Sequence, residues 1–229
     1  MKAVAIIPAG GSGKRMQCGL SKQYLLLSGI PLLVHTLKAF QDSPMIHGII
    51  LVVPAADMEF ATQSIVHKYG LSKVSHIFPG GKERQDSVKQ GLDAVGDEYD
   101  IVVIHDGVRP VISGDLIRLA ILEAFNETAV TAAVPVKDTV KTVDQDGWIL
   151  QTLERKNLWL TQTPQAFKRE VIKEAYRSAY HDCYYGTDDA ALVERIGVRV
   201  KIIPGSYDNI KITTKDDLLF AEEFMKAGK

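Results

Sequence analysis

The chain opens with Ala3-Val-Ala-Ile-Ile-Pro-Ala-Gly-Gly-Ser-Gly-Lys-Arg-Met16, a short apolar run that leads directly into a glycine-rich loop. The apolar residues Val4 to Ile7 predict a buried strand. Glycines at three of the next positions, namely Gly10, Gly11 and Gly13, allow a sharp turn and let backbone N–H groups approach an anion. Lys14 and Arg15 follow at once, and clustered cations beside such a loop favour a phosphate-rich ligand. The stretch therefore predicts a strand that ends at a nucleotide site.

Two common nucleotide-binding motifs do not fit this loop. A Walker A loop needs Gly-Lys-Ser/Thr, but Gly13 and Lys14 are followed by Arg15. A dinucleotide fingerprint aligned on Gly11 and Gly13 needs a glycine where Met16 stands. What remains resembles the signature loop of sugar- and polyol-phosphate nucleotidyltransferases. The alternative is a glycine-rich surface turn with incidental charges. Motifs elsewhere in the chain are needed to choose between these two interpretations.

Composition excludes several classes of protein. The 229 residues, 46% of them hydrophobic, suit one α/β domain. A net charge of −1 without a long basic block argues against nucleic-acid binding. Cys18 and Cys183 lack metal-ligand spacing and are interpreted as buried or idle thiols. The apolar run 3–9 is broken by Pro8 and does not resemble an export signal, so we expect a cytoplasmic protein.

Strand and helix patterns alternate along the chain. Strands are expected at residues 3–7, 47–53, 73–78, 100–105, 129–135, 198–203 and 209–213. Helices are expected at 31–41, 57–69, 84–95, 114–126, 168–180, 187–196 and 215–227. This alternation predicts a single α/β domain over residues 1–229, with a mostly parallel, twisted sheet flanked by helices. Ligands bind beyond the carboxyl ends of the strands in such sheets, and the opening loop lies at one of these ends.

One segment breaks the alternation, the arm at about residues 136–155. Asp146-Gly147 is a strong hairpin-turn signal between two β-prone runs, so a β-hairpin is expected here. A lone two-stranded hairpin is marginal in water, and the apolar run Trp148–Leu150 needs cover. Either the arm folds back on its own domain or it packs against another subunit, and the residues alone leave both possibilities open.

Polar side chains also follow other expected strands. The segment Gly80-Gly-Lys-Glu-Arg-Gln-Asp-Ser87 opens a helix, and it suits either contact with a nucleotide or a glycine turn with helix-capping side chains. Asp106 ends a buried run, where a carboxylate can hold Mg²⁺ against phosphate oxygens, although a turn-forming Asp is the alternative. Arg109 is expected to bind a phosphate or to pair with Asp106. Lys211 stands in an expected apolar strand and needs a partner, which a bound phosphate would supply.

His105 precedes Asp106 but has no metal-ligand partner at suitable spacing. We therefore interpret this histidine as structural.

Taken together, these motifs closely resemble the 2-C-methyl-D-erythritol 4-phosphate cytidylyltransferase family of the non-mevalonate isoprenoid pathway. The matching segments cover nearly the whole chain in the family's order: Pro8–Met16, Lys22–Tyr24, Gly81–Ser87, His105–Pro110, Pro135–Lys141, Thr163–Gln165, Thr187–Ala190 and Asn209–Thr213. The chain departs from the family pattern at Gly10, Ser21, Lys82 and Gly107. None of these departures removes a charged group that the reaction needs.

The resemblance implies a Rossmann-like nucleotidyltransferase fold with a protruding β-hairpin arm, and a Mg²⁺-dependent reaction. A phosphate oxygen of methylerythritol phosphate would attack the α-phosphorus of CTP and release pyrophosphate. The implied catalytic residues are Arg15, Lys22, Arg155 and Lys211. The implied CTP-binding residues are Ala9, Gly10, Gly11, Ser12, Gly13, Gly81 and Ser87. The implied substrate contacts are Asp106, Arg109, Thr139, Thr163 and Thr187, with Asp106 also at the metal and Asp208 a weaker second carboxylate.

The resemblance also implies a homodimer in which each arm reaches over the neighbour's site, so that Thr139 and Arg155 serve the partner. A ribitol-5-phosphate cytidylyltransferase is the nearest alternative, because it shares the loop and the reaction. The segments Lys137–Lys141 and Leu158–Gln165 look more like the methylerythritol family. A nucleotide-binding regulator without turnover would be expected to lose Arg15, Lys22 or Asp106, and all three are present.

Overall fold

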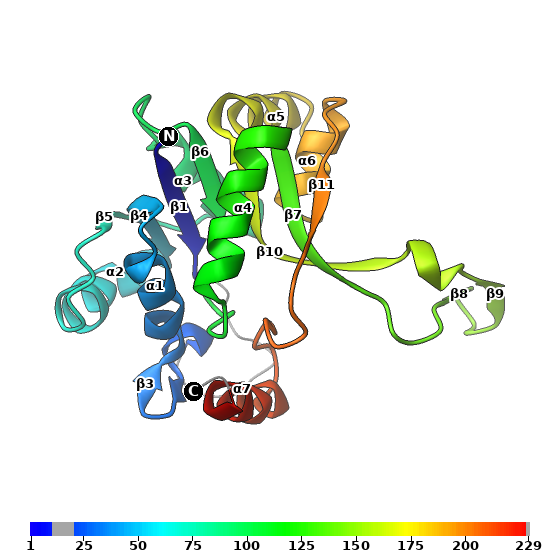
Figure 1. The fold of residues 1–229 in the computed structure, drawn as a ribbon, viewed down its shortest axis with the longest axis horizontal. Helices are drawn as coiled ribbons and strands as arrows, with labels where there is room; N and C mark the ends of the chain where they lie inside the picture. Colours follow the sequence, from blue (N-terminus) through cyan, green and yellow to red (C-terminus); the bar gives the residue numbers. More distant parts are fainter. Residues whose placement is uncertain (11–20, 228–229) are drawn as a thin grey trace.

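The structure, a computed structural model, describes residues 1–10 and 21–227 (Figure 1). The expectations for Gly11, Ser12, Gly13, Arg15 and Cys18 lie outside the described residues. No helix in the described part of the chain is both long enough and apolar enough to cross a membrane.

A seven-stranded sheet runs through the centre of the molecule, in the order β11-β7-β10-β6-β1-β4-β5. Its strands are β1 (Ala3–Pro8), β4 (Ile46–Val53), β5 (Val74–Pro79), β6 (Ile101–Ile104), β7 (Ala129–Pro135), β10 (Trp159–Lys168) and β11 (Lys201–Pro204). Neighbouring strands are parallel except at β10, which is antiparallel to both β6 and β7. The expected mostly parallel sheet is confirmed.

Helices cover both faces of this sheet because its central strands are apolar on both sides (Figure 1). In β1, Ala5 and Ile7 pack with α1 (Leu32–Asp42) and α4 (Gly114–Glu127) on one face. Val4 and Ile6 pack on the other face with α3 (Arg84–Asp93), α5 (Arg169–His181) and α6 (Asp189–Arg195). The remaining helical segments are α2 (Met58–Phe60), the π-helix Ala61–His67, α7 (Lys215–Ala227), and 3-10 turns at Lys22–Tyr24, Ala55–Asp57 and Arg155–Asn157. The two-stranded pair β2 (Leu26–Leu27) and β3 (Ile30–Pro31) precedes α1.

Two sequence-based strand assignments differ from the structure. The strand expected at 209–213 is wrong: these residues form an irregular connection to α7 that begins with a turn, where Asn209 N donates to Ser206 O. Its polar backbone groups bond outside the sheet, since Ile212 N donates to Val108 O at 2.9 Å and Asn209 O accepts from Arg109. Conversely, β10 was not expected, because Pro164 interrupts its pattern. The proline sits where the pairing with β7 slips between Thr161 and Gln165, a place where a strand tolerates it.

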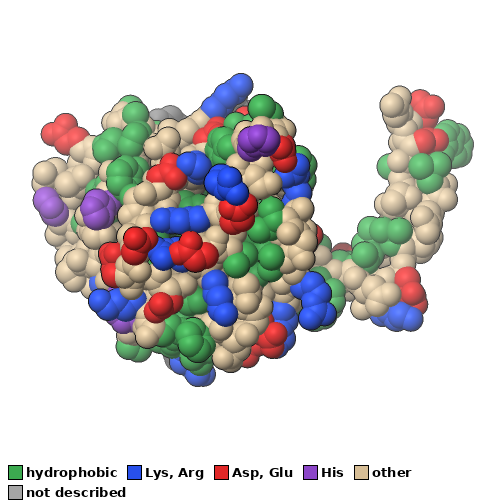
Figure 2. Space-filling view, turned by 90° about the horizontal axis from the view of Figure 1, so that it is seen from above, with side chains coloured by type: hydrophobic (Ala, Val, Ile, Leu, Met, Phe, Trp, Pro, Cys, Tyr) green, Lys and Arg blue, Asp and Glu red, His purple; other side chains and the backbone are tan. Residues whose placement is uncertain are grey.

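The arm between β7 and β10 contains the expected hairpin. Its strands β8 (Lys141–Val143) and β9 (Ile149–Thr152) pair antiparallel, and Gly147 adopts φ +87° in the turn between them. In both views the arm projects away from the body of the described chain (Figures 1 and 2). Trp148 is 75% exposed, and Ile149 and Leu150 are exposed with it. Within the described chain, therefore, the arm does not fold back on its own domain.

Candidate active site

A cavity of about 320 Å³ opens beyond the carboxyl ends of β1 and β6, next to the start of α3. Seven of the residues assigned from the sequence line it: Ala9, Gly10, Lys22, Gly81, Ser87, Asp106 and Lys211. They come from parts of the chain as far apart as Ala9 and Lys211. The parallel strands bring them together because their carboxyl ends meet at one edge of the sheet.

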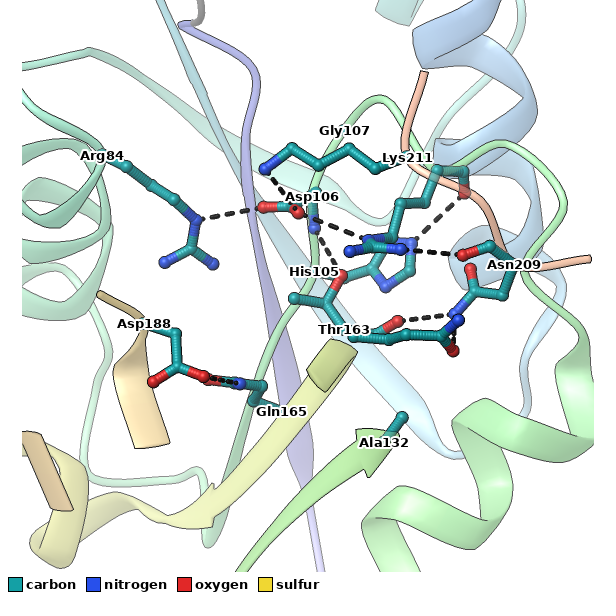
Figure 3. A network of polar contacts seen from close by, with 12 residues as sticks. Arg84, His105, Asp106, Gly107, Ala132, Thr163, Gln165, Asp188, Asn209 and Lys211 are labelled. Carbon is teal, nitrogen blue, oxygen red and sulfur yellow. Dashed lines mark hydrogen bonds and ion pairs between the residues drawn. The ribbon is translucent and has the colours of Figure 1, made fainter. Parts of the chain in front are cut away.

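Asp106 is the centre of the polar network at this edge, and three cations surround its carboxylate (Figure 3). Arg84 Nε lies 3.0 Å from Oδ1. Lys211 Nζ lies 3.0 Å and Arg109 Nε 3.4 Å from Oδ2. Burial acts to raise the pKa of the Asp106 carboxyl, but the charges of Arg84, Lys211 and Arg109 outweigh it and hold that pKa well below its usual range. Asp106 is therefore a fixed anion within an excess of positive charge.

The backbone around Asp106 is held from β10 and from the segment after β11. Asp106 N donates to Thr163 Oγ1 at 3.1 Å, and Asn209 Nδ2 donates to Thr163 O at 2.8 Å (Figure 3). Arg109 Nη1 donates to Asn209 O at 2.8 Å, so this arginine is tied to the same support as the carboxylate it pairs with. Of the two roles expected for Arg109, pairing with Asp106 is confirmed. Direct substrate contact by Thr163 or Arg109 stays a prediction.

His105 is fully buried beside this network, with Nε2 3.3 Å from Arg109 O and its ring tilted against Phe40. Burial lowers the pKa of His105 to about 3, so the imidazole is neutral at physiological pH. This agrees with the structural role expected for His105.

The loop before α3 is shaped by Gly81 and Ser87. Gly81 N donates to Ser87 Oγ at 3.2 Å, and Ser87 Oγ donates to Glu83 O at 3.2 Å. A Cβ on Gly81 would lie 2.2 Å from Asp86 Cβ, so only glycine fits here without a shift. Glu83 and Asp86 form a capping box at the start of α3. The loop is thus the helix-capping turn considered above, and it also forms one wall of the cavity.

Lys211 differs from expectation in its surroundings. It stands in an irregular connection rather than in a strand, and its side chain is 40% exposed. Its ammonium group pairs with Asp106, whereas the partner expected from the sequence was a bound phosphate. Contact with a phosphate stays a prediction.

Arg84 is the residue of this site that sequence reasoning missed. It begins α3, contacts Asp106 and places Nη1 2.8 Å from Asp189 Oδ2. The signal was the arginine inside the Gly80–Ser87 motif, together with acidic residues in the two other motifs that hold its partners. Local sequence could not show that these three motifs meet.

Several expected site residues are not brought to the cavity by this chain. Thr187 is exposed and lines an adjoining hollow, which shares the segment 82–84 with the cavity and also includes Tyr185. Thr139 and Arg155 are exposed on the arm, where Arg155 Nη1 donates to Lys137 O at 2.5 Å.

Asp208 and Cys183 are exposed as well. The prediction that the Cys183 thiol is buried is therefore wrong, and the alternative of an idle thiol remains.

The described residues do not fit a Mg²⁺ ion held by the protein alone. Within residues 1–10 and 21–227, no group of three or more His, Cys, Asp or Glu side chains is placed to hold a metal. Both carboxylate oxygens of Asp106 already face cations, and a further cation there would be repelled. The assignment of Mg²⁺ to Asp106 stays a prediction that this geometry does not favour.

Known proteins resemble the chain over its full length. The family model for 2-C-methyl-D-erythritol 4-phosphate cytidylyltransferase matches residues 3–227. The protein of that name from Syntrophus aciditrophicus is 55% identical over 98% of this chain and 96% of its own. The one from Geobacter metallireducens is 48% identical over 99% of this chain and 98% of its own.

Solved structures agree with these sequence matches. The 4-diphosphocytidyl-2C-methyl-D-erythritol synthase from Anaerococcus prevotii superposes with a TM-score of 0.86 at 34% identity, covering 98% of this chain and 96% of that one. The 2-C-methyl-D-erythritol 4-phosphate cytidylyltransferase from Francisella tularensis gives 0.81 at 31% identity, covering 98% of this chain and all of that one.

Proposed function

Because the chain belongs to the 2-C-methyl-D-erythritol 4-phosphate cytidylyltransferase family, we propose that the cavity at the ends of β1 and β6 is its active site. The protein is a cytidylyltransferase that joins CTP and 2-C-methyl-D-erythritol 4-phosphate, giving 4-diphosphocytidyl-2-C-methyl-D-erythritol and pyrophosphate. One observation carries the assignment of the site. Three cations gather on the single carboxylate of Asp106, at the sheet edge where the opening strand ends.

The reaction needs position and charge rather than a base. The attacking phosphate oxygen is already an anion, so the difficulty lies in bringing two polyanions together and stabilising the charge that develops on the transferred phosphoryl group. A cavity whose cations outnumber its central carboxylate is suited to this task, because net positive charge attracts both substrates.

Each residue then takes a part in this scheme. Ala9, Gly10, Gly81 and Ser87 would contact CTP along one wall of the cavity, together with Gly11, Ser12 and Gly13. Lys22 and Arg15 would stabilise the transition state and the departing pyrophosphate. Lys211 would hold the attacking phosphate, helped by Arg155, and Asp106, Arg109, Thr139, Thr163 and Thr187 would contact the polyol phosphate. Support comes from Ala9, Gly10, Lys22, Gly81, Ser87, Asp106 and Lys211, which line one cavity.

A divalent cation, Mg²⁺, is part of this proposal, and it would enter as a complex with the triphosphate of CTP. Mg²⁺ in such sites keeps several waters and is bound largely through substrate phosphates. This route needs no protein cage, in keeping with the cations that already surround Asp106.

We also propose a homodimer in which each arm completes the partner's site. Thr139 and Arg155 belong to the arm, which projects from the body of the described chain, and neither lines the cavity (Figure 1). The arm also exposes the apolar run Trp148–Leu150 to solvent. Apolar surface of this kind is normally covered by a partner. The cytoplasmic location expected from the sequence stays a prediction.

The test of the function is pyrophosphate release from CTP with a panel of polyol phosphates. We expect rapid release with 2-C-methyl-D-erythritol 4-phosphate and little with ribitol 5-phosphate. The reverse preference would restore the ribitol-5-phosphate alternative. Binding of CTP without turnover on any member of the panel would instead identify a nucleotide-binding regulator.

A further inference from the structure

Arg84 joins two carboxylates that come from different parts of the chain. Its Nε faces Asp106 in the cavity, and its Nη1 forms an ion pair with Asp189 at the start of α6. Asp189 is only 1% exposed, and its other oxygen accepts the Tyr176 hydroxyl at 2.5 Å. A buried, hydrogen-bonded carboxylate therefore fixes the far side of the guanidinium group.

The three cations on Asp106 are not held equally. Arg84 has Asp189 as a second partner, and Arg109 has Asn209 O, with side chains 30% and 10% exposed. Lys211 has the most exposed side chain of the three, at 40%, and it stands in an irregular connection rather than in a helix or strand. When a phosphate enters the cavity, Lys211 is the cation best able to leave Asp106 for it.

We propose that Arg84, braced by Asp189, is a positioning residue that holds Asp106 in place while Lys211 passes from Asp106 to the phosphate of the substrate. This inference rests on the proposed active site. Without Arg84, Asp106 keeps only Arg109 and Lys211 of its three cations, so the carboxylate attracts Lys211 more strongly. Phosphate then has to compete harder for the lysine.

The experiment compares single variants of Arg84 and of its brace with a matched control, and it measures the KM for each substrate separately. Arg84→Met removes the link, and Asp189→Asn removes its brace without touching the cavity lining. Tyr176→Phe removes only the hydrogen bond to Asp189 and keeps its carboxylate, so it provides a milder test if Asp189→Asn fails to fold. Asp188→Asn is the matched control. Its carboxylate caps α6 and accepts a hydrogen bond from Gln165, while the ion pairs of Arg84 in the described chain are with Asp106 and Asp189.

We expect Arg84→Met to raise the KM for methylerythritol phosphate by about 10-fold, while the KM for CTP changes less than about threefold. Asp189→Asn should raise the same KM by about threefold to 10-fold, Tyr176→Phe by less, and Asp188→Asn should leave it unchanged. Arg84→Lys, which keeps one charge but cannot bridge both carboxylates, should restore part of the loss. Normal KM values in both Asp189→Asn and Tyr176→Phe would overturn the bracing role.

A double-mutant cycle separates positioning from direct contact. If Arg84 acts through Asp106, Arg84→Met should change the KM for methylerythritol phosphate by less than about twofold in an Asp106→Asn background. The full 10-fold effect in that background would overturn the proposal and place Arg84 on the substrate.

Binding of inorganic phosphate, measured by titration calorimetry, needs no turnover and should weaken in Arg84→Met and Asp189→Asn. Unchanged phosphate affinity in Arg84→Met would refute the positioning role, whatever the activity. Absence of pyrophosphate release by the wild-type enzyme would instead refute the proposed function.

Discussion

Gly91 in α3 provides a quantitative test of how tightly this helix packs on the sheet. A Cβ at this position would lie 2.7 Å from Ile6 Cγ2, 3.4 Å from Val52 Cγ2 and 3.5 Å from Ile50 Cγ2. Ile6 and Val52 are fully buried, so their methyl groups have no solvent to move into. Gly91→Ala therefore has two opposite effects on the free energy of unfolding. Higher helix propensity raises it by about 1 kcal/mol, and overpacking against these methyl groups lowers it by about 1–3 kcal/mol.

We expect the overpacking effect to be the larger, so that the free energy of unfolding falls by about 1 kcal/mol. Urea unfolding of wild type and variant measures the difference through the transition midpoints. Gly114→Ala is the control, because Gly114 is exposed at the start of α4 and a Cβ there meets nothing within 4 Å. That variant should match or slightly exceed wild-type stability. A Gly91→Ala protein at least as stable as wild type would show that the contact at Ile6 relaxes freely and that the reasoning is wrong.

Three further predictions concern the reaction. Arg15→Ala and Lys22→Ala should each lower kcat by more than about 10²-fold while the unfolding midpoint hardly changes, and a kcat within about threefold of wild type would remove that residue from the mechanism. Turnover should vanish in excess EDTA and return with Mg²⁺, and Asp106→Asn should lower the rate while the Mg²⁺ concentration for half-maximal rate stays within about threefold. Mixing the inactive Arg155→Ala and Lys22→Ala homodimers should restore activity, up to about a quarter of wild type for random pairing of independent sites. Mixed dimers without activity would place Arg155 in its own subunit's site.

The sequence predicted those features that depend on local pattern. Apolar runs buried on both faces located β1, β4 and β6, and Asp146-Gly147 located the turn of the arm. β10 was not predicted because Pro164 breaks the strand pattern, and the register shift that accommodates this proline is visible only in the pairing with β7.

The candidate site divides in the same way. Asp106 and Lys211 could be found as charged residues next to apolar runs, and both line the cavity. The partner of Lys211 could not be found, because that lysine lies 105 positions from Asp106 in the chain and the contact is made by tertiary folding. Arg84 was missed for the same reason, because its role depends on ion pairs with Asp106 and Asp189, which belong to distant motifs.

The antiparallel course of β10 has a consequence for engineering the protein. Since β7 and β10 are neighbours, the arm leaves the sheet and returns to it at adjacent points, where Val136 N donates to Leu158 O at 3.0 Å. The whole arm is thus an insertion between two strands that would pair without it. Replacing residues 137–157 by a tight turn shortens a loop without rerouting the chain, and loop closure costs only slightly more or less free energy as the length of the loop changes. We expect the sheet and its helical layers to fold without the arm, so that CTP binding and subunit assembly can be measured separately.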